Sequence, residues 1–193
     1  LTLMMSLPFS LKYSAGPLFI ALCSVVAFFF EPMSGNFLAY DRYAIQGLET
    51  WRIVSGNIVH TNGYHLLLNL AGLALLWALH GEHYRIGLYL KVFVWCCLGT
   101  SVGLYFFSPD LIWYAGLSGA LHGIFAWGAC VDIKEKMKSG WLLLIGLAIK
   151  VGYEQIDGSS EQVANLIDAK VAVDAHLFGA LTGIAIFLLM FIT

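Results

Sequence analysis

Long apolar stretches recur along the chain and are separated by shorter polar segments. A helix that crosses the hydrocarbon core of a bilayer needs about 20 mostly apolar residues, and several of these stretches are that long. The pattern therefore predicts an all-α membrane protein with six transmembrane helices in a single domain, residues 1–193. The expected spans are residues 11–30, 64–80, 86–107, 118–132, 140–156 and 172–192.

The composition agrees with this pattern. Of the 193 residues, 60% are hydrophobic and 11% are charged, and the mean hydropathy is +0.80. Soluble domains carry about 25% charged residues, so these few charges cannot cover a water-exposed surface. The net charge of −2, without a basic patch, gives no indication of nucleic-acid binding. The four cysteines lie in apolar segments without paired or CxxC spacing, which favours buried thiols.

Two connecting segments are long enough to have a structure of their own. Residues 31–63 form a long first loop that is rich in aromatic residues and only weakly polar, which favours a segment embedded at the membrane interface. Residues 157–170 contain the small polar run Gly158-Ser159-Ser160, so we expect this segment to be the most mobile one.

The distribution of lysine and arginine indicates the orientation of the chain. Positive residues concentrate at Lys134, Lys136 and Lys138, between the fourth and fifth spans, and cytoplasmic loops carry such an excess. We therefore expect both termini to be cytoplasmic. The first apolar stretch is followed by Glu31-Pro32 rather than by a small-residue cleavage pattern, so we expect it to be retained as a span.

The fourth expected span is short, and this places a serine inside the membrane. From Ser118 to Val131 a helix rises about 20 Å, whereas the hydrocarbon core is about 30 Å thick. With Val131 at the cytoplasmic boundary, Ser118 lies below the opposite surface. The turn formed by residues 116–119 must then line a water-filled cavity, because irregular backbone does not face lipid.

Three more polar residues fall at a similar depth. Measured from the inner ends of their helices, Asn69, His65 and His176 lie about 17, 23 and 26 Å up, near the level of Ser118. His65 and Asn69 are four residues apart, so they point from one face of a helix. Because buried polar groups are costly in a bilayer, four of them at one depth indicate a site.

Small residues recur every four positions on the fourth and sixth spans. They are Gly119 and Gly123 on the fourth span, and Ala175, Gly179 and Gly183 on the sixth. Such stripes let helix backbones approach closely. Since His176 borders its stripe, we expect the two helices to bring Ser118 and His176 within hydrogen-bonding distance.

These residue types support acyl-transfer chemistry. A serine hydroxyl becomes a nucleophile when a histidine takes its proton, and the intermediate needs hydrogen-bond donors for its oxyanion. Ser118 at a helix N-terminus supplies backbone N–H groups, and His65 and Asn69 can add donors. Asp174 lies two residues before His176 and points to another face, so a Ser–His dyad is expected rather than a triad.

Four motifs occur in order on these spans. They are the GxSG of Gly116-Leu117-Ser118-Gly119, the AHxxGxxxG that runs from Ala175 to Gly183, the HxxxxHxxxN of His60, His65 and Asn69, and the WR of Trp51-Arg52. Together they resemble the rhomboid family of intramembrane serine proteases. The resemblance extends over the whole chain, which looks like the six-span core of the bacterial GlpG type.

The resemblance implies a role for each of these residues. Ser118 would be the nucleophile and His176 the base, with His65, Asn69 and the Ser118 backbone stabilising the oxyanion. Residues 31–63 would be an embedded structural element, and residues 157–170 would cap a water-accessible cavity.

It also implies the substrates and the location. The substrates would be transmembrane proteins cut within or near their spanning helix, often after a small residue. The chain would be a multi-pass protein of the bacterial inner membrane. We further assign Tyr153, at the end of the fifth span, and Gly116 to substrate access or gating. We expect no metal and no other cofactor, because His60, His65 and His176 lack a carboxylate or cysteine to complete a metal site.

Several of these residues have a simpler structural interpretation. Serine and histidine in spanning helices often tie one helix to another, which explains His65 and Asn69 about as well as an oxyanion role does. His60 and His122 are interpreted as structural, and His122 lies one turn deeper than Ser118. Lys150, inside the fifth span, has no explanation beyond reaching toward the interface.

Trp51 and Arg52 are expected to anchor the first loop rather than to catalyse. His80 and His83 are expected to be ordinary residues of the inner membrane interface.

Other function classes also remain open. Polar groups at mid-depth mark transport paths too, but the sequence shows no inverted repeat and no paired acidic residues within the spans. A rhomboid-like protein that binds membrane clients without cleaving them is the second alternative, although such proteins are expected to lose the serine or the histidine. Zinc and aspartyl protease chemistry fit less well, because there is no HExxH and no pair of membrane aspartates.

Overall fold

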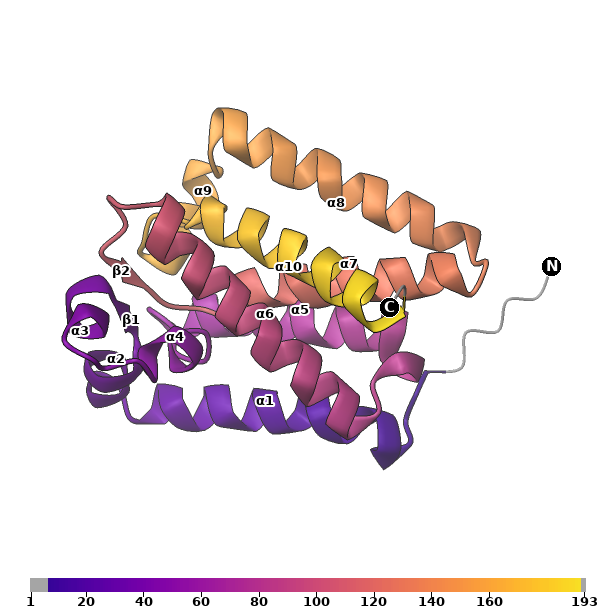
Figure 1. Ribbon diagram of the computed structural model, residues 1–193. Coiled ribbons are helices and arrows are strands. Elements are labelled where there is room, and N and C mark those ends of the chain that lie inside the picture. The colour runs from indigo at the N-terminus through magenta and orange to yellow at the C-terminus, as the bar shows by residue number, and fades with distance from the viewer. Residues whose placement is uncertain (1–6, 192–193) are drawn as a thin grey trace.

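Long helices carry the apolar stretches of the sequence and run alongside one another (Figure 1). The computed structural model describes residues 7–191. Within this range the helices of 17 or more residues are α1 (Leu11–Phe29), α5 (Gly63–His80), α6 (Ile86–Phe107), α7 (Ser118–Lys134), α8 (Lys138–Asp157) and α10 (Val173–Phe191). Their bounds follow the six predicted spans to within a few residues, except that residue 192, the last of the predicted sixth span, lies outside the described part.

Helix α7 is the centre of this bundle and contacts α5, α6, α8 and α10. Most of its residues are buried, and many of them are glycine or alanine, so the surrounding helices can approach from every side. Its short length follows from the glycine turn at Ser118 and from the polar end at Lys134. This central position makes α7 the element against which the site residues of the other helices are placed.

The helices differ in how well they suit a bilayer. Among the described residues, four segments are long and apolar enough to cross a membrane: α1, Gly63–His83, α6 and α10. Helix α7 has 17 residues, and α8 carries charged side chains within its 20 residues. The chain is thus an all-α membrane protein, as predicted, and the crossing of the membrane by α7 and α8 stays a prediction.

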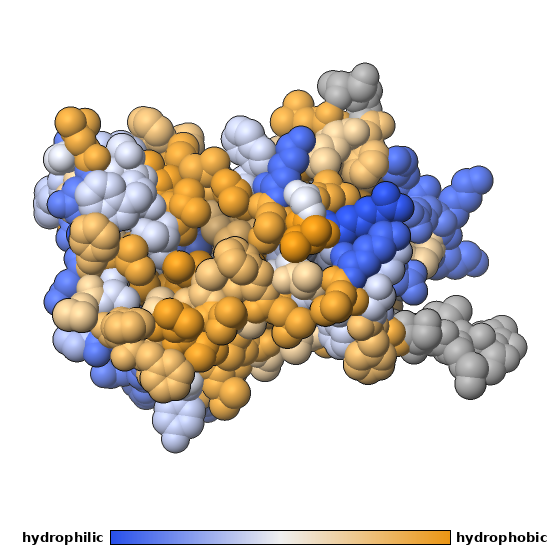
Figure 2. Space-filling view, turned by 90° about the horizontal axis from the view of Figure 1, so that it is seen from below, coloured by the Kyte–Doolittle hydropathy of each residue, from blue (hydrophilic) through white to orange (hydrophobic). Residues whose placement is uncertain are grey.

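The outer surface of the bundle is apolar. Large hydrophobic side chains point outward along α8, where Leu142, Ile149 and Ile156 are all highly exposed. Figure 2 shows a broad hydrophobic band over the middle of one face, with hydrophilic residues gathered toward the two ends. A soluble monomer rarely exposes an apolar area of this extent, so the band fits contact with lipid.

Helices α7 and α10 are in backbone contact through their glycines. A Cβ atom on Gly179 would overlap the carbonyl oxygen of Gly119, and one on Gly183 would overlap that of Gly123. The reverse also holds, because a Cβ on Gly123 would lie 2.7 Å from the carbonyl oxygen of Gly179. The predicted close packing of the two small-residue stripes is therefore confirmed.

The first loop folds into a structured region at one end of the bundle. It contains α2 (Met33–Leu38), β1 (Tyr40–Asp41), α3 (Arg42–Gln46) and α4 (Arg52–Ser55). Strand β1 pairs in antiparallel fashion with β2 (Trp113–Tyr114), which leads into α7. The loop is therefore joined directly to the segment that precedes Ser118.

Arginine and tryptophan side chains hold this loop together. Arg52 donates to the carbonyl oxygens of Ala39 (2.8 Å) and Asn36 (2.9 Å), and the Trp51 indole donates to Phe37 (3.0 Å). The predicted anchoring role of Trp51 and Arg52 is confirmed by these contacts.

A second arginine joins the loop to the long helix beside it. Arg42 donates to the carbonyl oxygens of Leu104, Tyr105 and Ser108, each at 2.9 Å, and so satisfies acceptors at the C-terminal end of α6.

At the opposite end, two histidines converge on one carboxylate. The Nε2 atoms of His80 and His83 lie 3.3 and 3.0 Å from the two carboxylate oxygens of Asp132. Only 1% of His80 and 2% of Asp132 are exposed. The expectation that His80 is an ordinary interface residue is therefore wrong, because the last turn of α5 packs inward against α7.

Candidate active site

A tight turn leads from β2 into α7 and places Ser118 at the first position of the helix. Gly116 has φ of +122°, and a Cβ there would lie 2.6 Å from Nε2 of His65. Both facts require glycine. The hydroxyl of Tyr114 donates to the carbonyl of Gly116 (2.7 Å), and the Gly116 N–H donates to the carbonyl of Gly56 (3.1 Å). The turn before Ser118 is thus fixed by the first loop.

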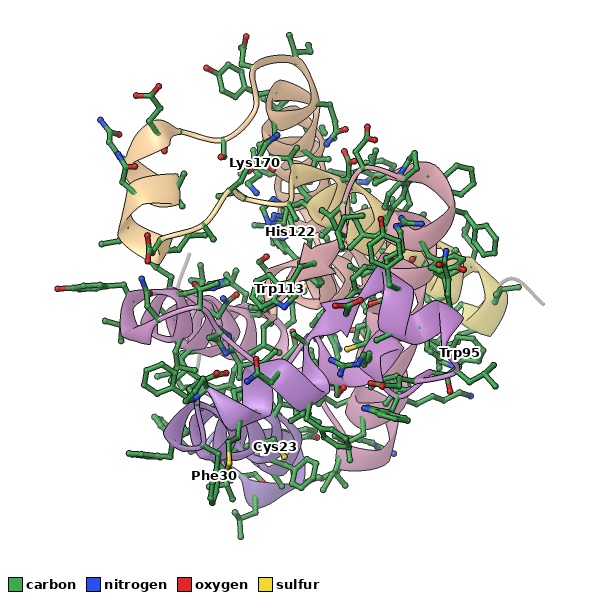
Figure 3. The ribbon with its side chains drawn as sticks, turned by 90° about the vertical axis from the view of Figure 1, so that its left-hand side faces the viewer. Cys23, Phe30, Trp95, Trp113, His122 and Lys170 are labelled. Carbon is green, nitrogen blue, oxygen red and sulfur yellow. The ribbon has the colours of Figure 1, made fainter. Side chains whose placement is uncertain are left out.

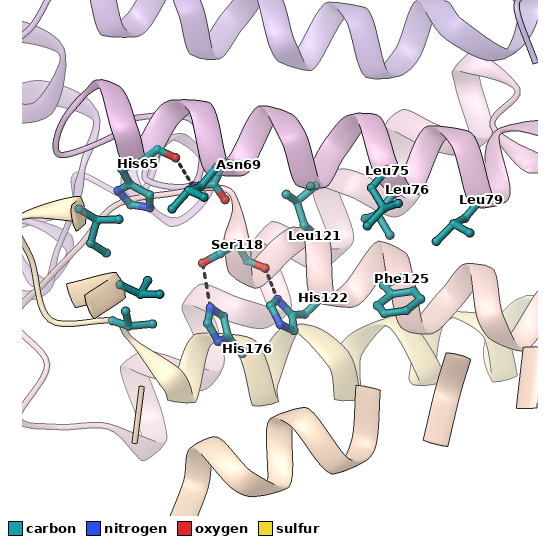
Figure 4. A pocket seen from close by; sticks show the side chains of 15 residues that line it. His65, Asn69, Leu75, Leu76, Leu79, Ser118, Leu121, His122, Phe125 and His176 are labelled. Atoms are coloured by element: carbon teal, nitrogen blue, oxygen red, sulfur yellow. Dashed lines mark hydrogen bonds between the residues drawn. The ribbon is translucent and has the colours of Figure 1, made fainter. Parts of the chain in front are cut away.

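The side chains of Ser118 and His176 meet where α7 crosses α10. Oγ of Ser118 lies 3.0 Å from Nε2 of His176 (Figure 4). His176 is 5% exposed, whereas Ser118 is half-buried at the edge of a cavity. The glycine contacts between the two helices produce this distance, because a wider crossing would separate the two side chains. The expected approach of Ser118 and His176 is therefore present, and their roles stay predictions.

Helix α5 contributes the two other predicted polar residues. Asn62 caps this helix by accepting from the N–H of His65 (2.8 Å). The amide nitrogen of Asn69 donates to the carbonyl of His65 (3.0 Å), one turn earlier on the same helix. The side chains of His65 and Asn69 both line the cavity beside Ser118. Nδ1 of His65 lies 3.0 Å from the hydroxyl oxygen of Thr61 and 3.4 Å from its backbone nitrogen, so Thr61 holds the ring at the cavity wall.

Ser118 lies between two cavities of different character. The first, of about 300 Å³, runs along α5 and α7 and is lined mainly by apolar side chains such as Leu75 and Phe125. The second, of about 630 Å³, extends toward the loops and has polar residues on its wall, including Lys170 and Asp174. One cavity thus suits an apolar peptide segment and the other suits water.

The segment predicted to cap the site contains α9 (Glu161–Ile167), which lies beside α5. Figure 3 looks onto this end of the bundle, where α9 lies at the periphery next to the start of α5. Ile167 lines both cavities, and its carbonyl accepts from the hydroxyl of Thr61 (2.6 Å). The carbonyl of Leu166 accepts from the amide of Asn62 (3.0 Å). The segment therefore covers the site, as expected, and is joined to the start of α5.

Sequence reasoning did not predict that His122, Lys150 and Glu154 contact the Ser118–His176 pair. His122 stacks on His176, with ring centroids 4.1 Å apart, and its Nδ1 lies 2.6 Å from the carbonyl oxygen of Ser118. On α8, Glu154 lies 2.8 Å from Nδ1 of His176, and Lys150 contacts Glu154, His122 and His176. The available signal was the pair of opposite charges, four residues apart, inside an otherwise apolar span.

Three of these side chains are of the kinds that bind metals. One atom each from His122, Glu154 and His176 lies within 4.8 Å of the other two. The ammonium group of Lys150 lies within 3.2 Å of three such atoms, so a cationic group already occupies this position. The atoms are Nε2 of His122, Oε2 of Glu154 and Nδ1 of His176. The prediction that the protein needs no metal stays a prediction.

The remaining candidates have structural surroundings. His60 is buried with its ring edge-on to that of His65, and burial lowers the pKa of His60 to about 3. Asp174 accepts a hydrogen bond from the hydroxyl of Ser108, so it is engaged with α6 rather than with His176. Tyr153 lies on the outer face of α8 and is 62% exposed. Its assignment to gating stays a prediction.

Comparison with known proteins agrees with this arrangement. The sequence model of the Rhomboid domain matches residues 47–193, about three quarters of the chain, and this region includes every residue placed at the site above. A search of curated proteins finds no match. Because the family model covers well over half of the sequence, the chain belongs to the rhomboid family.

Proposed function

We propose that the protein is an intramembrane serine endopeptidase in which Ser118 is the nucleophile and His176 the general base. The observation that carries this proposal is the 3.0 Å contact between Ser118 Oγ and His176 Nε2 at the start of α7. The family match supports it, since intramembrane serine proteolysis is the activity that the family resemblance implies. A histidine at this distance can take the serine proton as the hydroxyl attacks a carbonyl carbon.

The reaction needs no group beyond those present on the chain. Ser118 Oγ bonds to the carbonyl carbon while its proton passes to His176 Nε2, and the carbonyl oxygen becomes an oxyanion. His176 then gives the proton to the leaving amine as the peptide bond breaks. A water molecule releases the acyl group in the same way, giving its proton to His176 as it attacks, and the serine recovers its hydrogen.

The oxyanion requires donors that are already in place. The first turn of α7 has backbone N–H groups without intrahelical partners, and its dipole favours negative charge there. The side chains of His65 and Asn69 border the same cavity and are proposed as further donors.

The proposed substrate is a transmembrane protein that is cut within or near its spanning helix. The apolar cavity supports this proposal, because leucines of α5, such as Leu68, Leu75 and Leu79, line it close to Ser118. The polar cavity beside the loops would supply water. Gly116 and Tyr153 are proposed to influence substrate access.

We propose a bacterial inner membrane, as the family resemblance implies, and cytoplasmic termini, which the lysines at positions 134, 136 and 138 favour. Reporter fusions at both termini and in residues 157–170 test this orientation. Equal labelling of a terminus and of residues 157–170 from outside the membrane would contradict it.

A fluorophosphonate probe tests the proposed nucleophile directly. Wild type in lipid is expected to be labelled, and labelling is expected to disappear in Ser118→Ala and in His176→Ala. Ser159→Ala, in the loop before α9, is the matched control and should be labelled like wild type. Labelling that survives in Ser118→Ala would refute the assignment. A folded wild type that is not labelled would favour a client-binding protein without protease activity.

A further inference from the structure

The second ring nitrogen of His176 has an acidic partner on another helix. Nδ1 of His176 lies 2.8 Å from Oε2 of Glu154, which is on α8 near its C-terminal end. The side chains of both residues are well buried, at 6% and 12% exposure. The carboxylate therefore contacts one ring nitrogen of His176, Nδ1, while Ser118 contacts the other, Nε2.

The contacts around this pair determine where the protons lie. The carbonyl oxygen of Ser118 can only accept, so Nδ1 of His122 is the donor in their 2.6 Å contact. Nε2 of neutral His122 is then an acceptor, and it accepts from the ammonium of Lys150 (2.6 Å). Lys150 also donates to Glu154 (2.8 Å), and a cation at this distance favours the ionised form of the carboxyl group.

The same reasoning fixes the tautomer of His176. Nδ1 of His176 lies 2.8 Å from the carboxylate of Glu154, which accepts, and 3.2 Å from the ammonium of Lys150, which can only donate. The shorter contact, with the carboxylate, assigns the hydrogen to Nδ1. Nε2 of His176 then has a free lone pair directed at the hydroxyl of Ser118. This is the tautomer that a general base requires.

A simple ion pair between Lys150 and Glu154 accounts for only part of this arrangement. The two residues are four positions apart on α8, with side chains 44% and 12% exposed, and ion pairs at that spacing on a helix contribute little to stability. The same oxygen of Glu154 also contacts His176, which is on α10. A bond between two helices, made to the ring that faces Ser118, indicates a role in orienting that ring.

We propose that Glu154 is a positioning residue that completes a Ser118–His176–Glu154 triad, with Lys150 and His122 holding the carboxylate and the ring in place. This inference rests on the proposed function and deepens it. When the proton of Ser118 passes to Nε2, the ring becomes a cation, and the adjacent carboxylate stabilises it without taking the proton. The proton then goes from Nε2 to the leaving amine.

The decisive variants differ only in the carboxylate. Glu154→Gln keeps the size of the side chain and removes the charge, and Glu154→Asp keeps the charge on a shorter chain. Glu135→Gln makes the same change at an exposed site at the end of α7 and is the matched control. For each we would measure kcat and KM on a transmembrane substrate in liposomes, the melting temperature, and the ¹⁵N spectrum of labelled histidine.

Glu154→Gln is expected to lower kcat by about 100- to 10,000-fold, the range seen when the orienting acid of a triad loses its charge, with KM little changed. Glu154→Asp should recover part of that loss, and Glu135→Gln should behave as wild type. The Nδ1-protonated signal of His176 should be present in wild type and lost in Glu154→Gln. Purely structural support would instead lower the melting temperature of both variants and leave the tautomer unchanged.

The outcomes separate this inference from the proposed function. Wild type that cleaves substrate, together with unchanged kcat and tautomer in Glu154→Gln, would overturn the role of Glu154 and leave the protease assignment standing. A folded wild type that neither cleaves substrate nor reacts with the fluorophosphonate probe would refute the protease assignment and the triad, and a tautomer that still depends on Glu154 would then show only that the carboxylate orients the ring.

Discussion

The imidazole of His122 stacks on that of His176, with the ring centroids 4.1 Å apart and the planes 12° from parallel. Both residues lie on the cavity wall beside Ser118, one from α7 and one from α10. The stack covers one face of the His176 ring, while Glu154 and Ser118 contact its two nitrogens. The His176 ring is thus restrained in both its plane and its rotation.

Removing this stack should reduce catalysis. We expect His122→Ala to lower kcat by about 10- to 100-fold, because a freed His176 ring spends less time aligned with Ser118. His122→Phe keeps an aromatic face on the ring and should retain more activity than His122→Ala. Equal kcat in wild type and His122→Ala, measured on one transmembrane substrate, would show that the stack does not orient His176.

Asn69 is the residue whose two interpretations can be separated most clearly. Its amide bonds to the carbonyl of His65, so the hydrogen bond that is lost with this side chain lies within α5. Asn69→Ala is therefore expected to leave the melting temperature nearly unchanged. Its kcat should fall by about 10- to 1,000-fold if the amide turns to the oxyanion during reaction.

Exposed Asn165, on α9, provides the control for that change. Asn165→Ala should keep wild-type kcat. A reduced melting temperature with normal kcat in Asn69→Ala would show that Asn69 has a structural role and does not stabilise the oxyanion.

The positions of the long helices could be predicted because a bilayer requires long apolar segments. Long apolar runs gave the six long helices to within a few residues, because spanning length and apolar composition are linked. The glycine spacing predicted the approach of His176 to Ser118, whereas the depth of Ser118 in the membrane, inferred from the short fourth span, stays a prediction. Each of these inferences depends on one helix or on one pair of helices, so the sequence pattern is enough to make it.

The parts that were missed depend on how the helices are rotated against each other. Glu154 is directed at His176 only because α8 presents that face to α7 and α10, and no periodic pattern in an apolar helix specifies its rotation. The pairing of β1 with β2 joins residues about 70 positions apart and leaves no local signal. Helix α9 has only seven residues, too few for a hydrophobic period to be recognised.

The cap over the site should limit turnover. Ile167 is 6% exposed and lines the cavity beside Ser118, whereas its neighbour Leu166 is 40% exposed. We expect Ile167→Ala to loosen the packing of α9 and to raise kcat by about two- to tenfold, because opening of a lid limits many enzymes of this kind. Leu166→Ala is the matched control and should have little effect. Unchanged turnover in Ile167→Ala would place the limiting motion elsewhere, with α8 the next element to test.

The contact between Gly183 and Gly123 should control both stability and activity. A methyl group on Gly183 would overlap the carbonyl oxygen of Gly123, and backbone cannot yield as the end of a side chain can. Gly183→Ala should therefore destabilise the protein by about 1–3 kcal/mol, as overpacking of a close contact does. Since the same crossing sets the distance between Ser118 and His176, labelling by the fluorophosphonate probe should fall as well.

Gly146 on α8 provides the matched control for Gly183→Ala. No atom lies within 4 Å of a Cβ built there, so Gly146→Ala should be neutral or should stabilise the helix by up to about 1 kcal/mol. Unfolding in detergent, followed for both variants under one condition, measures the difference. Equal stabilities would mean that α7 and α10 do not rely on backbone contact. A loss of stability in Gly183→Ala without loss of labelling would mean that the distance from Ser118 to His176 does not depend on this crossing.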